Sequence, residues 1–229
     1  MQVFLGRGTT TQNDRWFIAT VVICVCLLSA LPAKATDKPL QLAIGYTAGA
    51  VALDNNLTNY RWSTTPRFET GIEAALIWGR FAAGARVLHT NTTQATGIPG
   101  ETTTPQVSLV GTELVGQYRV LSYRGVSLSG SAHGGMMHMG YNPDRLTFDA
   151  GGIAPPISVS YKPIWEPVFG VGVVVGGHLT DHLALGLQAE QSTFSLDTSH
   201  RLGNQIIEER ERFYNWSLRL RISWVMRLR

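Results

Sequence analysis

The stretch Phe68–His89, FETGIEAALIWGRFAAGARVLH, decides the fold that this sequence predicts. In its first eleven and in its last nine residues, every second side chain is apolar, apart from Thr70 and His89. Period two indicates a β-strand, because successive side chains of a strand leave opposite faces of the pleat. The two residues between the runs, Gly79 and Arg80, suit a tight turn. The stretch therefore predicts a β-hairpin.

This register gives the hairpin one apolar face and one charged face. Trp78 is expected opposite Phe81 on the apolar face, and Glu73 opposite Arg86 on the other. The first strand spans roughly 33 Å at about 3.3 Å per residue. Tilted by about 40°, it crosses roughly 25 Å, which is the height of the apolar band on a transmembrane β-barrel.

The composition of the whole chain also favours a barrel. Charged residues make up 15% of the sequence, compared with about 25% in ordinary soluble proteins. Beyond the N-terminus, no run approaches the ~20 apolar residues of a membrane-spanning helix. A transmembrane barrel satisfies both facts, because alternation dilutes its apolar side chains. The net charge of +3 is small and gives no reason to expect a nucleic-acid partner.

Residues 1–35 have the three parts of a secretory signal peptide. A polar start with two arginines precedes the apolar run Trp16–Leu31, and Ala33-Lys34-Ala35 fits the small-x-small cleavage rule. We expect cleavage after this tripeptide, leaving 36–229 as the barrel. An uncleaved anchor helix is the alternative, but sixteen residues are few for a bilayer. Both cysteines lie in the apolar run, so the mature chain would have no disulfide.

The same alternation marks eight strands in all. They are expected at 40–52, 68–78, 81–89, 107–118, 126–139, 165–179, 183–190 and 214–226. Their connections are alternately long and short, as in outer-membrane barrels with short periplasmic turns and long outer loops. The long ones include a connection over 141–162, whose end keeps the alternation of the next strand, and a charged loop over Ser195–Arg212. The predicted fold class is all-β, an eight-stranded antiparallel up-and-down transmembrane barrel.

The residue inventory of the two faces predicts which one meets lipid. The apolar faces of the eight strands carry no Asp, Glu, Lys or Arg. The opposite faces carry Glu69, Glu73, Arg86, Glu113, Glu166, Glu190, Arg219 and Arg221. A secreted soluble barrel would turn the apolar set inward. Its exterior would then be Gly, Ala and Ser with few charges, which is a poor surface for solubility. We therefore expect apolar side chains to face lipid and charged ones to face the lumen.

An eight-stranded lumen is just wide enough to be filled by side chains. An isolated charge there costs several kcal/mol, and a hydrogen-bonded ion pair recovers much of that. We expect a paired lumenal charge network of Glu73, Arg86, Glu113, Glu190, Arg219 and Arg221. Its simplest role is a structural plug; the alternative is a gate in a narrow path for ions or small solutes.

Aromatic residues near the strand ends suit the girdles that mark membrane interfaces. One rim is expected to hold Trp78, Phe81, Tyr118 and Trp224, and the other Phe68, Trp165, Phe169, Tyr214 and Trp216.

Over Leu40–Arg229, this pattern of strands, loops and lumenal charges resembles the small eight-stranded outer-membrane barrels, the group that includes OmpX, OmpW and the transmembrane part of OmpA. The resemblance implies location in a bacterial outer membrane, contact with its lipid and lipopolysaccharide, and insertion by the barrel-assembly machinery. That machinery reads an aromatic-bearing last strand. This chain departs from the group by ending Arg227-Leu228-Arg229 instead of on an aromatic. It also lacks the peptidoglycan-binding domain of OmpA, so no wall-anchoring role is expected.

Some barrels of this size are hydrolases of lipid A that use a serine, a histidine and an acid. Ser131 and His133 share one face, and Glu113 is expected opposite His133, where it would orient the imidazole. This face points into the lumen, away from acyl chains, and the local motifs of those deacylases are absent. No catalytic site is therefore expected.

Two further clusters invite a binding interpretation. His133 and the run Met136–Met139 are potential metal ligands, but alternation divides the run between two faces, so no metal or other cofactor is expected. Tyr60-Arg61-Trp62 in the first loop is either an exposed binding patch or a segment resting on the barrel rim.

The sequence thus predicts a non-enzymatic integral outer-membrane protein with a structural or surface-interaction role carried by four outer loops. A narrow channel is the first alternative, and a lipid A-modifying enzyme the second.

Overall fold

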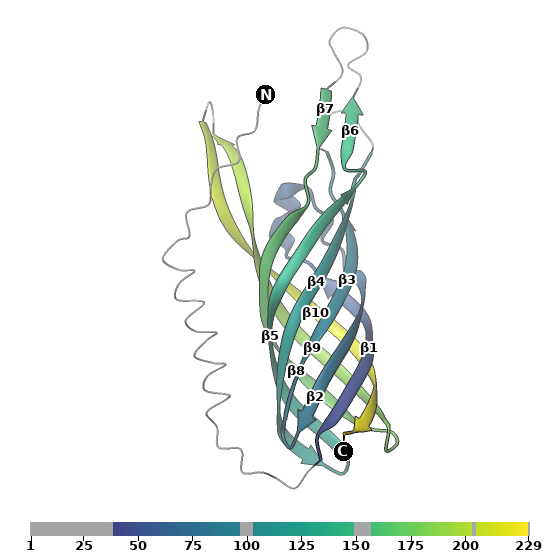
Figure 1. Cartoon of the computed structure of the whole chain (residues 1–229). Helices are drawn as coiled ribbons and strands as arrows, with labels where there is room; N and C mark the ends of the chain where they lie inside the picture. Colours follow the sequence, from purple (N-terminus) through teal and green to yellow (C-terminus); the bar gives the residue numbers. More distant parts are fainter. Residues whose placement is uncertain (1–38, 97–102, 149–156, 203–204, 229) are drawn as a thin grey trace. The chain divides into compact units, whose positions relative to one another are not determined.

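The computed structural model describes residues 39–96, 103–148, 157–202 and 205–228 (Figure 1). Its elements are β1 (Gln41–Ala52), the 3₁₀-helix η1 (Asn55–Tyr60), β2 (Arg67–Trp78), β3 (Phe81–Thr93), β4 (Gln106–Tyr123), β5 (Val126–Asn142), β6 (Arg145–Phe148), β7 (Ile157–Ser160), β8 (Ile164–His178), β9 (Leu183–Leu202) and β10 (Gln205–Arg227). Eight of them close into one antiparallel ring in the order β1, β10, β9, β8, β5, β4, β3, β2. The predicted eight-stranded barrel is confirmed.

The predicted signal peptide, residues 1–35, lies outside the described residues, so its cleavage stays a prediction. In the described part of the chain, no helix is long and apolar enough to cross a membrane.

The β2–β3 hairpin has the register that its sequence predicts. Trp78 pairs with Phe81, and Glu73 pairs with Arg86. The turn between them needs a left-handed residue, which Gly79 supplies with a φ of 60°. The rings of the first pair stack with centroids 6.4 Å apart. The hairpin thus places an aromatic contact at its turn and two charges on its other face.

The two faces of the wall point as expected. Ile72, Leu187 and Leu220 face outward, with 63%, 50% and 46% of their surface exposed. Glu73 and Arg219, next to two of them in the chain, are 5% and 1% exposed in the lumen. An apolar exterior around a charged interior is the arrangement that a hydrocarbon environment requires. The barrel is therefore a membrane-spanning barrel of the outer-membrane type.

The predicted charged loop Ser195–Arg212 is wrong, because this segment continues β9 and β10. The two strands pair without interruption from Leu183–Trp224 to Leu202–Gln205. Asp197 lies opposite Arg210, and their side chains are 2.9 Å apart. Opposite charges on facing residues stabilise a strand pair, so a charge-rich sequence is compatible with strand here.

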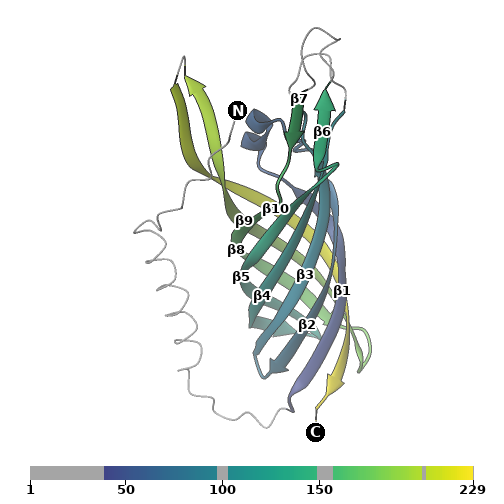
Figure 2. The same cartoon turned by 45° about the horizontal axis from the view of Figure 1, so that its top comes forward.

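The part of this strand pair that is farthest from the short turns, here called its outer part, leaves the ring. The pairing of β9 with β8 begins at Thr193, and that of β10 with β1 ends at Trp216. Beyond these residues, the described pairings of each strand are with the other alone. The result is a two-stranded ribbon that projects from the barrel in both views (Figures 1 and 2). β10 has 23 residues, or roughly 75 Å of strand, far more than a bilayer needs.

The longest connection forms a second projection. β6 pairs with β7, from Arg145–Ser160 to Phe148–Ile157. The expected continuation of strand six back to Ile157 is therefore wrong, since this segment belongs to a separate hairpin. Stacked rings of Tyr141 and Tyr161, 5.0 Å apart, lie at its base.

An apolar cluster that we did not predict fills the outer end of the lumen. The first loop folds back as η1, and its Leu57 is fully buried together with Phe213. Trp62 is also buried there, and the ring of Tyr60 meets that of Phe213 edge-on at 5.8 Å. Tyr60 and Trp62 therefore pack on the barrel, and Arg61 between them is the one exposed residue of this run. We call this cluster the outer cap. Its buried members are Val51, Leu53, Leu57, Trp62, Val107, Leu109, Met137, Met139, Val168, Phe194, Leu196 and Phe213.

We expect Leu220→Arg to destabilise the folded barrel in lipid vesicles by about 2–4 kcal/mol. Leu220 faces outward, four residues from Trp216 and four from Trp224 on the same strand, which places it at mid-depth. The measurement is urea unfolding followed by tryptophan fluorescence. Leu179→Arg is the matched control, because Leu179 is also exposed, at 61% against 46% for Leu220, but lies at a turn; it is expected to cost about 0–1 kcal/mol. Equal effects of the two substitutions would contradict this orientation.

Candidate functional site: the lumenal charge network

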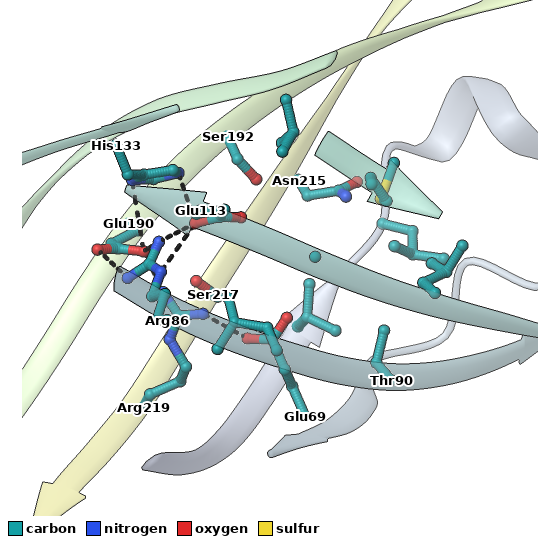
Figure 3. A pocket seen from close by; sticks show the side chains of 17 residues that line it. Glu69, Arg86, Thr90, Glu113, His133, Glu190, Ser192, Asn215, Ser217 and Arg219 are labelled. Carbon is teal, nitrogen blue, oxygen red and sulfur yellow. Dashed lines mark hydrogen bonds and ion pairs between the residues drawn. The ribbon is translucent and has the colours of Figure 1, made fainter. Parts of the chain in front are cut away.

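Arg86 of β3 lies at mid-barrel between two carboxylates (Figure 3). Its Nη1 and Nη2 donate to Oε1 and Oε2 of Glu190 at 2.9 and 2.7 Å. Its Nε donates to Oε2 of Glu113 at 2.8 Å. All three side chains are buried. The two parallel bonds to Glu190 form a bidentate pair, in which geometry as well as charge fixes the contact.

Glu190 of β9 joins the second arginine to the first. Arg219 of β10 donates through Nη2 to Glu190 and through Nη1 to Oε2 of Glu69, the latter at 2.8 Å. Glu190 also accepts from the side-chain amide of Gln188 and, at 3.4 Å, from the hydroxyl of Ser131. These contacts tie β2, β3, β4, β5, β9 and β10 together across the lumen. A carboxylate with this many donors recovers much of the cost of its burial.

Arg221 and Glu73 form a separate branch nearer the short turns. Nη1 of Arg221 donates to Oε1 of Glu73 at 3.0 Å and to Oε1 of Gln117 at 3.4 Å. Although Glu73 and Arg86 face each other in the hairpin, they pair with different strands. All six residues expected in the network thus make ion pairs, but in two groups: Arg86, Glu113, Glu190 and Arg219 in one, and Glu73 and Arg221 in the other.

The sequence-based network omitted Glu69 and Gln188. Both lie on the inner faces of their strands, so alternation alone could have placed them in the lumen. Their partners depend on strand order across the ring, which alternation does not reveal.

Glycines on β8 leave the room that these side chains need. A β-carbon on Gly172 would lie 2.4 Å from Cγ of Glu190, and one on Gly170 would lie 2.4 Å from the His133 ring. Real β-carbons do not approach so closely, so larger residues would displace the network.

The predicted opposition of Glu113 and His133 is wrong. β4 continues to Tyr123, the turn is short, and a β-bulge follows Arg119. Glu113 therefore pairs with Gly135. The His133 nitrogens lie 3.9 Å from Glu113 and 3.7 Å from Glu190.

The serine does not join a hydrolase-like triad. The hydroxyl of Ser131 bonds to Glu190, and no hydrogen bond joins it to His133 within the described chain. In that same part of the chain, no group of three or more His, Cys, Asp or Glu side chains could hold a metal ion. Met137 and Met139 are buried in the outer cap while Met136 faces outward, so alternation divides this run.

Cavities lie on both sides of the two ion-pair groups. A small one of about 40 Å³, enough for a few water molecules, separates the main group from the outer cap. A larger one of about 220 Å³ reaches the short turns. The ionic cluster therefore divides the lumen.

The aromatic residues occupy the two ends of the outer surface. At the end with the short turns, Phe81 contacts both Trp78 and Tyr118, with a centroid distance of 4.9 Å to the latter, and Trp224 stacks on His182 at 5.6 Å. Toward the other end, the exposed aromatics are Phe68, Trp165, Tyr214 and Trp216. Phe169 is half-buried over Gly134.

We expect Arg86→Met to lower the free energy of unfolding by about 3–5 kcal/mol, because it leaves Glu113 and Glu190 buried with one partner fewer. The measurement is urea unfolding in lipid vesicles. Asp197→Asn is the matched control: the Asp197 side chain is 78% exposed and its partner Arg210 keeps a second carboxylate, Glu166, so it should cost at most about 1 kcal/mol. A loss for Arg86→Met no larger than that of the control would show that the network does not stabilise the barrel.

The comparisons with known proteins concern the fold. No protein-family model matches the chain, and no curated protein matches its sequence. Among solved structures, the chain is similar to Neisserial surface protein A, with 11% identity, a TM-score of 0.46, and 82% of this chain and 99% of that one covered. It is also similar to the outer-membrane protein AlkL, with 18% identity, a TM-score of 0.45, and 86% and 95% covered.

A third similar structure is Ail, the attachment invasion locus protein of Yersinia pestis, solved in complex with the heparin analogue sucrose octasulfate. The identity is 11% and the TM-score 0.39, with 82% of this chain and 97% of Ail covered. The closed ring, the apolar exterior and the charged lumen are observed in the structure of this chain itself. Its fold is that of the small eight-stranded barrels of bacterial outer membranes.

Proposed function

We propose that this chain is a non-enzymatic integral outer-membrane protein whose structural or surface-interaction role is carried by its outer segments. The observation that supports this is the contrast between the two ends. One end carries η1, the β6–β7 hairpin and the β9–β10 ribbon, whereas the strands at the other end are joined by short turns. Short turns are periplasmic in such barrels, so the elaborate end faces outward from the cell.

The lumen supports the same proposal. The main ion-pair group crosses it at mid-height, and the outer cap closes its outer end. In this role, the network is a structural plug that holds opposite walls together. The aromatic rims would lie at the two interfaces, in contact with lipid and lipopolysaccharide. Residues 1–35 would be removed on export, and the barrel-assembly machinery would insert the remainder.

Topology is tested by labelling single cysteines in intact cells. Asp197→Cys should react with a membrane-impermeant maleimide, because this side chain is exposed on the ribbon. Arg124→Cys should react only after the outer membrane is permeabilised, because Arg124 lies in the β4–β5 turn. The wild-type chain, in which both cysteines precede residue 27, is the control for background. The reverse pattern of labelling would contradict the proposed orientation.

The surface role is tested by shortening the ribbon. Replacing residues 196–211 by a two-residue turn should leave heat-modifiable gel migration intact, because no ring pairing involves these residues. The same change should abolish any adhesion or cell aggregation that expression of the wild type confers. Shortening the β6–β7 hairpin is the matched control, because it removes residues from the same end of the barrel and leaves the ribbon intact. Adhesion that survives both deletions would contradict a loop-carried role.

A narrow channel is the second candidate, since a cavity already extends from the turns to the Arg221–Glu73 pair. Single-channel recording separates it from a plug. We expect no reproducible conductance steps for wild type or for Arg86→Ala, because the outer cap blocks the path independently of the network. Steps in wild type that change size in Arg86→Ala would instead support the channel.

A further inference from the structure

The larger lumenal cavity differs in chemistry from the rest of the barrel. It has a volume of about 220 Å³ and reaches the β2–β3 and β4–β5 turns. About half of its lining consists of glycines, alanines and serines, which come from all eight strands of the ring and from the β4–β5 turn. Charged side chains enter it from the β2–β4 wall and from β10. We call this cavity the vestibule.

Three arginines lie at that wall. Arg221 extends across the lumen from β10, so that its Nη1 is 3.4 Å from Oε1 of Gln117 on β4. Arg119 is the next lining residue of β4 toward the turn, and its backbone N–H donates to the carbonyl of Arg80 at 2.8 Å. A β-bulge between Arg119 and Leu121 shifts the register of β4 against β5 at this point. Bulges at barrel rims commonly re-aim side chains.

The vestibule has more positive charge than its own acids neutralise. Glu73 is the one acidic residue in its lining, and it is paired with Arg221. Arg80 and Arg119 make no side-chain hydrogen bond or ion pair with another described residue. Elsewhere in this lumen, Arg86 and Arg219 are both paired with carboxylates. Arg80 is exposed at the β2–β3 turn and Arg119 is half-buried, so both guanidinium groups are free to bind a solute at the vestibule.

A buried donor without an acceptor in the protein lies at the same wall of the vestibule. The amide nitrogen Nε2 of Gln117 is buried and has no hydrogen-bond partner. Its orientation is set by Arg221, which donates to the oxygen of the same amide. A donor at this wall can be paired only by an acceptor inside the cavity. An anion held by Arg119 would supply acceptor oxygens beside this amide.

We propose that the vestibule binds a small oxyanion that enters from the periplasm, a phosphate or a carboxylate-bearing solute. Guanidinium groups present paired N–H donors that match the oxygens of such anions. The volume is below the roughly 300 Å³ of sites for drug-sized ligands, so the site suits a compact ion. The barrel wall separates it from lipid, which favours a dissolved anion over a lipid headgroup. This site is independent of the outer segments and of their proposed role.

The test is a titration with inorganic phosphate of the full-length mature chain, folded in maltoside micelles that contain no phosphate. The Nε–H signals of the arginines are followed by NMR, at constant ionic strength with chloride. Wild type should show a saturable shift. Arg119→Gln should weaken binding at least fivefold. Arg124→Gln, which removes a guanidinium from the same end of the barrel but outside the vestibule, should stay within twofold of wild type.

Three results would overturn the proposal: no saturable shift in wild type, equal weakening by both substitutions, or the same shifts with short-chain phosphatidylglycerol in place of phosphate. Heat-modifiable migration checks that each variant is folded. Arg80→Gln provides a second variant in the vestibule, and it should weaken binding in the same way. Phosphate binding that Arg80→Gln and Arg119→Gln both leave unchanged would equally exclude this site.

Discussion

The structure depends on one constraint: in hydrocarbon, every backbone N–H and C=O must be paired within the protein. β1 meets β10 to complete the ring, so no strand edge faces lipid within it. Once the ring is closed, every second side chain of each strand points into the lumen. The charges of this chain lie on those alternate positions, and at eight strands the lumen is too narrow to keep them apart. Ion pairing across the lumen follows from closure.

The lumen consequently has three layers, which differ in the interactions between their side chains. The outer cap is held by apolar burial around Phe213 and Leu57. The middle layer is held by charge-assisted hydrogen bonds to Glu190. The third layer is a cavity at the short turns, lined in part by the guanidinium-bearing residues Arg80 and Arg119. The first two layers hold the walls together, and the third is a cavity that reaches the short turns. A single chain thus separates a filled half of the lumen from a hollow half.

Strand alternation predicted the barrel, the register of the β2–β3 hairpin and the side of the wall that each charge occupies, because these depend on neighbours in sequence. The ion-pair partners of the lumenal charges could not be predicted in the same way. Glu73 faces Arg86 in the hairpin yet bonds to Arg221, since ring closure places β10 and β2 on either side of β1 and sequence spacing does not encode that. The ribbon was missed because its charges suggested a loop, although Asp197 and Arg210 pair across it. The outer cap was missed because Leu57 lies in a segment that reads as polar.

The direction of the side chains is the central claim, and acyl-chain contacts measure it most directly. In lipid nanodiscs, methyl NMR signals of Ile72, Leu187 and Leu220 should show nuclear Overhauser effects to lipid acyl chains. Those of Leu88, Leu109 and Val174, which are buried in the lumen, should show none. Acyl contacts at the second set and not at the first would contradict the account, because charged residues such as Glu190 would then face lipid.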